Sequence, residues 1–417
     1  MEDMSASSET ILEGLDDAQM SAVTALDGPV RIIAGAGAGK TRTVTRRIAY
    51  ACARGDWDAR KVLAVTFSVK AAAEMRARLQ TLGVGDDVTA ATFHSAALQQ
   101  LRRVWDDIFE TPLPHVTSDQ RENVERAIRR VTNAADIDAQ QVRDVRAEIN
   151  WTKVSLVAPD DYPRVCSATR RQPPAELDPQ RFADIITAYE GEKTVRGQID
   201  FDDILLLVCH VMDDYEELAA SIRSSIGWLT VDEYQDVSPL QHRLMTLWLG
   251  NNRNVCVVGD PAQTIYSFAG ASSYDLLHFA DEFRPLAADV TLNTDYRSTP
   301  QVVRYANRVL AAAARTGNKY LVLRSARSGG PRVGHTCYDT DEEEARGIAA
   351  RIARLVAGGV DPGACAVLTR INAQQPAICA ALRAEGLRYR VRRDSGWQNS
   401  RSRMMRRAVW PCWRPRD

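Results

Sequence analysis

The sequence predicts an α/β fold in which helices flank a parallel β-sheet. Short apolar runs recur along the chain, and segments with helical spacing follow several of them, as expected for such a sheet. Small polar and aromatic residues stand directly after several runs, at the edge where open α/β sheets bind ligands. The predicted strands are Val30 to Ile33, Val62 to Val65, Val88 to Ala91, Trp228 to Val231, a run from Val255, and Val290 to Leu292.

The composition is that of an ordinary globular protein. The 417 residues suffice for two or three domains, with 45% hydrophobic and 26% charged residues. A net charge of −1 means that any nucleic-acid site must be a local patch. Scattered cysteines without a C-x-x-C pair argue against zinc or disulfides and favour a reducing compartment. With no signal peptide and no long apolar run, we expect a cytoplasmic protein without a membrane partner.

The first predicted strand runs into a glycine-rich loop. The segment AGAGAGKT, Ala34 to Thr41, stands between this strand and a helical segment, which is the context of a P-loop. Its glycines let backbone N–H groups point at phosphate oxygens, Lys40 adds a positive charge, and the Thr41 hydroxyl can ligate Mg²⁺. Ala34 occupies the position of the first glycine in the strict pattern. The predicted nucleotide-binding residues here are Ala34, Gly35, Ala36, Gly37, Ala38, Gly39, Lys40, Thr41 and Arg42.

A short helix is predicted before this strand. Residues 1–10 are polar and expected to be disordered, and residues 15–23 have amphipathic spacing. The carboxamide of Gln19 can bond both edges of an adenine ring. Taken alone, Gln19 is more typical of an ordinary surface residue.

The second and third strands end in similar residues. Thr66, Phe67 and Ser68 follow one strand, and Thr92, Phe93, His94 and Ser95 follow the other. Phe67 is either a base-stacking ring or a core residue, and His94 taken alone is typical of a cap or a core position.

Residues 106–197 are predicted to form a helical insertion. Ser118 is expected to cap one helix, and Asp138 to begin another. The acidic residues within residues 199–208 complement the dipole of a further helix. Basic residues of the insertion either face a phosphate backbone or form a solvated surface: Arg129, Arg130, Arg143, Arg146 and Lys153.

An acidic pair follows the strand that ends at Val231. Beside a P-loop, Asp232 would hold Mg²⁺ and Glu233 would deprotonate the water that attacks the γ-phosphate. The alternative is an acidic cluster at a helix N-terminus.

Two further segments carry polar and aromatic residues. In VCVVGDPAQTIYSFAGA, Gln263 is placed to sense a phosphate, and Tyr266 and Phe268 can present rings to a base. In LNTDYRSTP, Tyr296 and Arg297 precede a helix begun by Pro300 and would fit adenine stacking and γ-phosphate contact. The plain alternative is an ordinary loop entering a helix. Beyond it, strands are expected at 332–337, 365–369 and 389–391, with helices at 341–356 and 373–385.

Together these segments resemble the superfamily 1 DNA helicases of the UvrD/Rep/PcrA family, over about residues 11–392. The motifs stand in the family's order: LDDAQ, AGAGAGKT, AVTFSVKAAAEM, TFHS, DFDD, VDEYQD, VVGDPAQTIYSFAGA and LNTDYRS.

The resemblance implies RecA-like P-loop NTPase domains with ATP between them and 3′→5′ translocation along single-stranded or partly duplex DNA. The implied domains are 11–105 with 198–294, the insertion 106–197, and part of a second RecA-like domain at 295–392. The implied catalytic residues are Lys40, Asp232, Glu233, Gln263 and Arg297, with Thr41 and Asp232 on Mg²⁺. Gln19 and Tyr296 would contact adenine. The implied DNA-binding residues are Phe67, Thr92, His94, Tyr266 and Phe268.

The sequence departs from the family pattern in several places. Val69 replaces a common Asn, Phe268-Ala269 replaces Trp-Arg, and no segment resembles the family's motifs V and VI. Residues 393–417 are rich in Arg and Trp and lack a helix or strand period, so we expect either out-of-frame translation of a truncated helicase or a basic nucleic-acid-binding tail. In the family, motif VI supplies a second arginine that stabilises the transition-state charge, an arginine finger. Because motif VI is not found in this sequence, we expect ATP binding with weak turnover and little strand separation.

The alternatives to a helicase are a non-catalytic ATP- and DNA-binding fragment, a helicase–nuclease subunit of the AddA/RecB kind, and an unrelated P-loop kinase. No nuclease-like cluster of carboxylates with Lys, and no iron–sulfur cysteine spacing, supports the nuclease. A kinase would not explain VDEYQD, GDPAQ and DYRS in that order.

Overall fold

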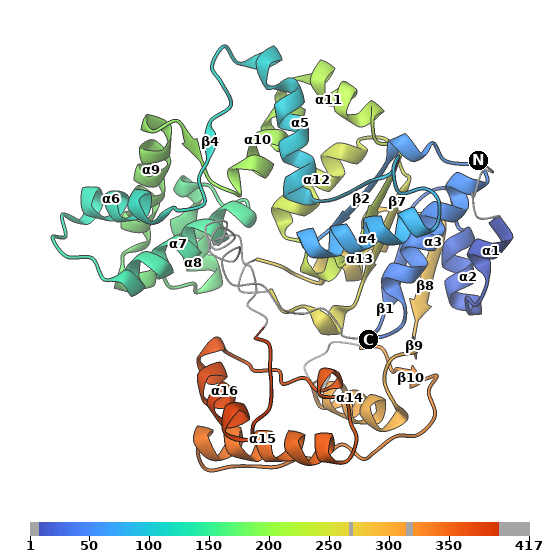
Figure 1. The fold of residues 1–417 in the computed structure, drawn as a ribbon. Coiled ribbons are helices and arrows are strands. Elements are labelled where there is room, and N and C mark those ends of the chain that lie inside the picture. Colours follow the sequence, from blue (N-terminus) through green and yellow to red (C-terminus); the bar gives the residue numbers. More distant parts are fainter. Residues whose placement is uncertain (1–7, 267–269, 314–319, 392–417) are drawn as a thin grey trace, which may run out of the picture. The chain divides into compact units, whose positions relative to one another are not determined.

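The computed structural model describes residues 8–266, 270–313 and 320–391. The chain divides into two compact units, residues 1–331 and 332–417. Figure 1 shows the elements of both units.

A six-stranded sheet forms the centre of the first unit, in the order β3-β2-β6-β7-β1-β8. Every neighbouring pair is parallel, which confirms the parallel sheet predicted from the apolar runs. Its strands are β1 (Val30–Ala34), β2 (Val62–Thr66), β3 (Thr89–Thr92), β6 (Trp228–Val231), β7 (Val255–Gly259) and β8 (Ala288–Leu292).

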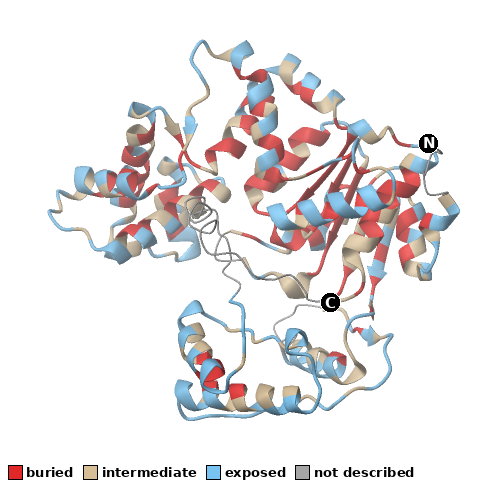
Figure 2. Ribbon diagram, in the orientation of Figure 1, coloured by how far each residue is buried: buried red, intermediate tan, exposed pale blue. Residues whose placement is uncertain are grey.

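Helices cover both faces of this sheet, and a separate hydrophobic core fills each face. One core holds Val44, Ile48 and Met75 from the helices that follow β1 and β2. The other holds Leu101 and Trp248 among many apolar side chains. Because both faces are covered, most sheet residues are buried (Figure 2), which explains why the strands are continuous apolar runs. The helices around the sheet are α1 (Ser8–Leu12), α2 (Asp17–Thr24), α3 (Lys40–Ala53), α4 (Val69–Thr81), α5 (Phe93–Ile108), α10 (Asp203–Asp214), α11 (Glu216–Ser224), α12 (Pro239–Leu249) and α13 (Tyr274–Glu282).

The insertion is helical, as the sequence predicts, and has its own core around Phe182, Tyr162 and Ile149. It is joined to the rest by a short parallel pair, β4 (His115–Val116) and β5 (Gln198–Ile199). Its helices are α6 (Arg121–Thr132), α7 (Ala139–Val154), α8 (Tyr162–Thr169) and α9 (Pro179–Val195). Asp138 caps α7 as expected, but Gln120 rather than Ser118 precedes α6.

Three further expectations are wrong. Ser8 to Thr10, expected to be disordered, begin α1. Lys153, expected on a basic surface, is 7% exposed, because carboxylates distant in sequence surround it. Residues 295–331, expected in the second RecA-like domain, fall within the first of the two compact units, which ends at residue 331. This stretch holds β9 (Thr294–Asp295), α14 (Pro300–Ala313) and β10 (Arg324–Ser325).

The third concerns the second unit. Its predicted helices are present as α15 (Asp341–Ala357) and α16 (Gln375–Ala384), which pack through Ala349, Ile378 and Leu382. The three predicted strands are absent between residues 332 and 391, because those segments have no backbone partner there; Leu368 in the middle segment is 94% exposed. Among the helices of the described chain, none combines the length and the apolar character needed to cross a membrane.

Candidate functional site

The strand order brings the predicted site residues to one edge of the sheet. The carboxyl ends of β6, β7, β1 and β8 lie side by side, because these strands are neighbours and parallel. They carry, in that order, Asp232 with Glu233, Asp260 with Gln263, the P-loop, and Asp295. The ends of β2 and β3, which carry Phe67 and His94, continue the same edge. This is the edge at which open α/β sheets bind ligands.

The P-loop has the backbone that phosphate binding requires. Gly37 and Gly39 take φ values of +71° and +82°, and Gly39 immediately precedes α3, so the helix N-terminus faces the loop. A Cβ on Gly37 would lie 2.1 Å from Oδ1 of Asp295. Ala34 ends strand β1 in extended conformation, so this position does not need the glycine of the strict pattern.

The two residues after Gly39 face the acidic pair. Nζ of Lys40 lies 3.9 Å from Oε2 of Glu233, and the Thr41 hydroxyl donates to Oδ2 of Asp232 at 3.4 Å. Burial and the neighbouring Glu233 charge raise the pKa of Asp232 to about 6. A hydroxyl and a carboxylate are hard oxygen ligands, and a bound cation would compensate the crowded negative charge. These residues therefore fit Mg²⁺.

A hydrogen-bonded chain links the acidic pair to Gln263. Gln235 donates from Nε2 to Oε2 of Glu233 at 2.9 Å and accepts at Oε1 from the Asp260 N–H at 2.9 Å. Asp260 in turn accepts from Nε2 of Gln263 at 2.6 Å. Glu233 has a φ of +55°, a conformation rare for a residue with a side chain and found at functional sites. Sequence reasoning missed Gln235 and Asp260; their positions inside VDEYQD and GDPAQ were the available signal.

Gln19 and Tyr296 both donate hydrogen bonds to backbone carbonyls of the P-loop. Gln19 is 1% exposed, and its Nε2 donates to the Ala38 carbonyl at 3.0 Å. The Tyr296 hydroxyl donates to Asp16, and its N–H donates to the Gly37 carbonyl at 3.0 Å. The bond from Tyr296 to Gly37 links this loop to the P-loop, and Asp295 holds the loop's own turn by accepting from the N–H of Arg297 at 2.6 Å.

Arg42 follows the P-loop and is a predicted nucleotide-binding residue. Its guanidinium donates to the Gly14 carbonyl at 3.0 Å, so it is bonded to the loop before α2. A cavity of about 270 Å³ lies beside the P-loop and Gln263, and apolar side chains of α14 line its other side.

The predicted DNA-binding residues form two groups. Phe67, 38% exposed, stacks on Tyr266 with ring centroids 4.5 Å apart. His94 stacks on Phe201 at 3.7 Å. Thr92 is buried and caps α5 by accepting from the Ser95 N–H, so its hydroxyl serves the helix. Phe268 lies outside the described residues.

The fold and the site define a P-loop protein with a RecA-like sheet. Residues 15–284 match the family model of the UvrD/REP helicase N-terminal domain, and residues 290–396 match that of the UvrD-like helicase C-terminal domain. The chain belongs to the UvrD/REP helicase family.

Named relatives agree with this placement. The chain is 44% identical over 409 residues to the ATP-dependent DNA helicase UvrD2 of Mycobacterium tuberculosis H37Rv, covering 95% of this chain and 57% of that protein. It is 31% identical over 391 residues to the ATP-dependent DNA helicase PcrA of Bacillus subtilis 168, covering 92% and 51%. The chain thus spans about half the length of the curated relatives it matches.

Proposed function

We propose that this chain is an ATP-dependent DNA helicase of the UvrD type, which uses ATP and Mg²⁺ to move 3′→5′ along single-stranded DNA. The observation that carries the proposal is the single sheet edge that holds both the P-loop with its acidic pair and the exposed Phe67–Tyr266 stack. The names of the relatives, which describe ATP-dependent DNA helicases, support the same activity.

The nucleotide would lie on the P-loop. Backbone N–H groups of residues 35–39 and the Lys40 ammonium would neutralise phosphate charge, and Arg297 would reach the γ-phosphate. Thr41 and Asp232 would hold Mg²⁺, which would screen the charge that develops on the phosphates during transfer. Gln19 and Tyr296, which both contact the backbone of the P-loop, would lie at the adenine end, as their positions in the family's motifs suggest.

Glu233 would act as the general base. Its carboxylate is held by Gln235 on one side and lies near Lys40 on the other, so it is oriented rather than free to rotate. It would accept a proton from the attacking water. Gln263, tied to the same chain of hydrogen bonds through Asp260, would report whether a γ-phosphate is present.

Single-stranded DNA would pass over the ends of β2 and β3. The Phe67–Tyr266 stack offers an aromatic surface for a base, which contributes about 1–3 kcal/mol per stacked base. His94 lies at the start of α5, beside the same edge. A cytoplasmic location fits the seven cysteines of the described residues, all of which are free.

Two binding measurements on three forms of the chain test this proposal. Wild type should bind both a fluorescent ATP analogue, in the presence of Mg²⁺, and a labelled oligothymidylate. Lys40→Ala should lose nucleotide binding and keep DNA binding, whereas Phe67→Ala should weaken DNA binding about 10-fold and keep nucleotide binding. If either variant lost both nucleotide binding and DNA binding, or kept both, the result would contradict the proposal that one sheet edge carries two separate binding sites.

A further inference from the structure

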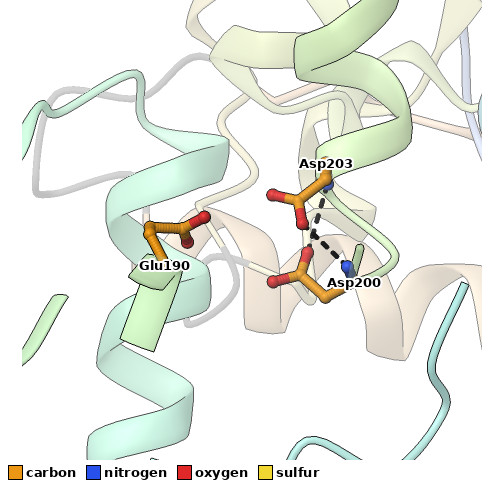
Figure 3. A group of neighbouring side chains, drawn as sticks. All are labelled: Glu190, Asp200 and Asp203. Atoms are coloured by element: carbon orange, nitrogen blue, oxygen red, sulfur yellow. Dashed lines mark hydrogen bonds between the residues drawn. The ribbon is translucent and has the colours of Figure 1, made fainter. Parts of the chain in front are cut away.

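A buried ionic cluster joins the helical insertion to the sheet domain. Glu190 and Lys193 come from α9 and Lys153 from the end of α7, while Asp200 precedes α10 and Asp203 is its first residue. Figure 3 shows the three carboxylates, which face one another across the junction. Asp200 is fully buried, and both lysines are at most 7% exposed.

Two ammonium groups occupy the space between these carboxylates. Nζ of Lys153 lies 2.6 Å from Oδ1 of Asp203 and 2.9 Å from Oε1 of Glu190, and it also pairs with Asp200. Nζ of Lys193 lies 3.0 Å from Oδ2 of Asp200 and 2.9 Å from Oε2 of Glu190, and it also pairs with Asp203. The cluster is therefore nearly balanced in charge and holds its own cations, so it is not a metal site.

The electrostatics show that the charges are mutually supported. Burial alone would lower the pKa of Lys153, but the carboxylates of Asp200, Asp203 and Glu190 raise it well above its ordinary value. Burial works against the Asp200 carboxylate as well, yet the Lys153 and Lys193 ammonium groups hold its pKa well below its usual range. Lys153 stays charged, and removing either lysine leaves an uncompensated buried carboxylate.

The cluster fixes a tight turn. The Asp200 N–H donates to Oδ2 of Asp203 at 2.7 Å, and the N–H groups of Asp202 and Asp203 donate to Oδ1 of Asp200 at 3.1 Å. Each aspartate thus uses its carboxylate both for the lysines and for the backbone of the turn. The turn cannot relax while the lysines hold both carboxylates.

The same turn packs against the side chain of His94. Phe201, between the two clustered aspartates, stacks on the His94 imidazole with ring centroids 3.7 Å apart. Oδ1 of Asp202 lies 3.7 Å from Nε2 of His94. That nitrogen is buried and has no hydrogen-bond partner within the described chain. The imidazole therefore packs on the Phe201 ring and lies beside the Asp202 carboxylate, and its Nε2 makes no hydrogen bond that would fix the ring independently of this turn.

We propose that Lys153 and Lys193 are positioning residues for DNA binding, which act through the Asp200–Asp203 turn on His94. The helical insertion is thereby coupled to the DNA-contacting edge of the sheet: a shift of α7 or α9 moves the lysines, the turn and the imidazole together. This inference rests on the proposed DNA contact of His94, and the experiment separates the two.

A double-mutant cycle on oligothymidylate affinity tests the inference. The variants are Lys153→Met, His94→Ala and the double variant, with Lys61→Met, an exposed lysine at the opposite end of β2, as the matched control. We expect Lys153→Met and His94→Ala each to weaken binding about 5-fold, the double variant to be no weaker than about 10-fold, and Lys61→Met to match wild type. If Lys153 only stabilised the fold, the effects of the two single substitutions on DNA affinity would multiply in the double variant.

A second cycle keeps the test decisive if Lys153→Met does not fold. Phe201→Leu retains an apolar side chain but removes the ring under His94, and it should show the same non-additivity with His94→Ala. Multiplying effects in this cycle, or in the first, would overturn the positioning role and leave the DNA contact intact. An unchanged affinity in His94→Ala alone would instead refute the DNA contact and the inference with it.

Discussion

Nε2 of Gln235 donates to Oε2 of Glu233 at 2.9 Å, while Oε1 of the same side chain accepts from the backbone of Asp260. One buried amide therefore joins the strand that carries the proposed base to the strand that carries Gln263. The junction is tight, because a Cβ on Gly259 would lie 2.6 Å from this oxygen. A change at Gln263 can reach Glu233 through this amide.

Replacing Gln235 with Ala should lower the rate of ATP hydrolysis while leaving nucleotide binding intact. The carboxylate of Glu233 would lose the group that orients it, and general-base catalysis contributes about 10²–10⁴-fold, so we expect a loss of about 10-fold or more in kcat. Steady-state kinetics with varied ATP checks this. Gln241→Ala, in the cap of α12, is the control. A change in KM alone would show that Gln235 serves binding instead.

Gly37→Ala should abolish ATP binding. Its φ of +71° disfavours a side chain, and the added Cβ would collide with the Asp295 carboxylate. The control is Gly55→Ala, because Gly55 has a φ of +78° but no neighbour within 4 Å. We expect the control to lose only about 1 kcal/mol of stability and to bind ATP normally. Equal ATP affinity in the two variants would show that Asp295 does not pack on the P-loop.

Asp200→Asn should destabilise the protein in a pH-dependent manner. The pKa of Asp200 in the folded protein lies well below its value of about 3.8 in the unfolded chain, so the unfolded state binds this proton more tightly. The stabilisation by the carboxylate is therefore complete above pH about 5 and is lost as the pH falls below about 4 towards the lowered pKa. We expect a difference of about 3 kcal/mol between wild type and variant at pH 7, shrinking in acid.

Urea denaturation at several pH values measures this difference. Asp214→Asn, a substitution at an exposed carboxylate of α10, should leave the free energy of unfolding nearly unchanged at each pH. If the gap between Asp200→Asn and wild type stays constant down to pH 3, the lysines do not hold Asp200 charged.

Local patterns predicted the sheet, the P-loop and the acidic pair, because a strand, a glycine-rich turn and a helix are encoded within about a dozen residues. The same patterns could not place Lys153, since its partners lie 47 and 50 positions away and only the folded chain surrounds it with carboxylates. Gln235 was missed for the same reason: its bond to Asp260 spans 25 positions. The strands expected after residue 331 are absent although their apolar runs are present. An apolar run forms a strand only where a neighbouring strand pairs with it, and a local pattern does not show whether that neighbour exists.

Hydrolysis of ATP by the 417-residue chain, measured with and without single-stranded DNA and beside Lys40→Ala, tests the proposed function most directly. If the P-loop and the Phe67–Tyr266 stack, which share one sheet edge, belong to one motor, single-stranded DNA will raise the rate, and Lys40→Ala will abolish both the basal and the stimulated activity. A rate that DNA leaves unchanged, or one that survives Lys40→Ala, would contradict the coupling of the two sites.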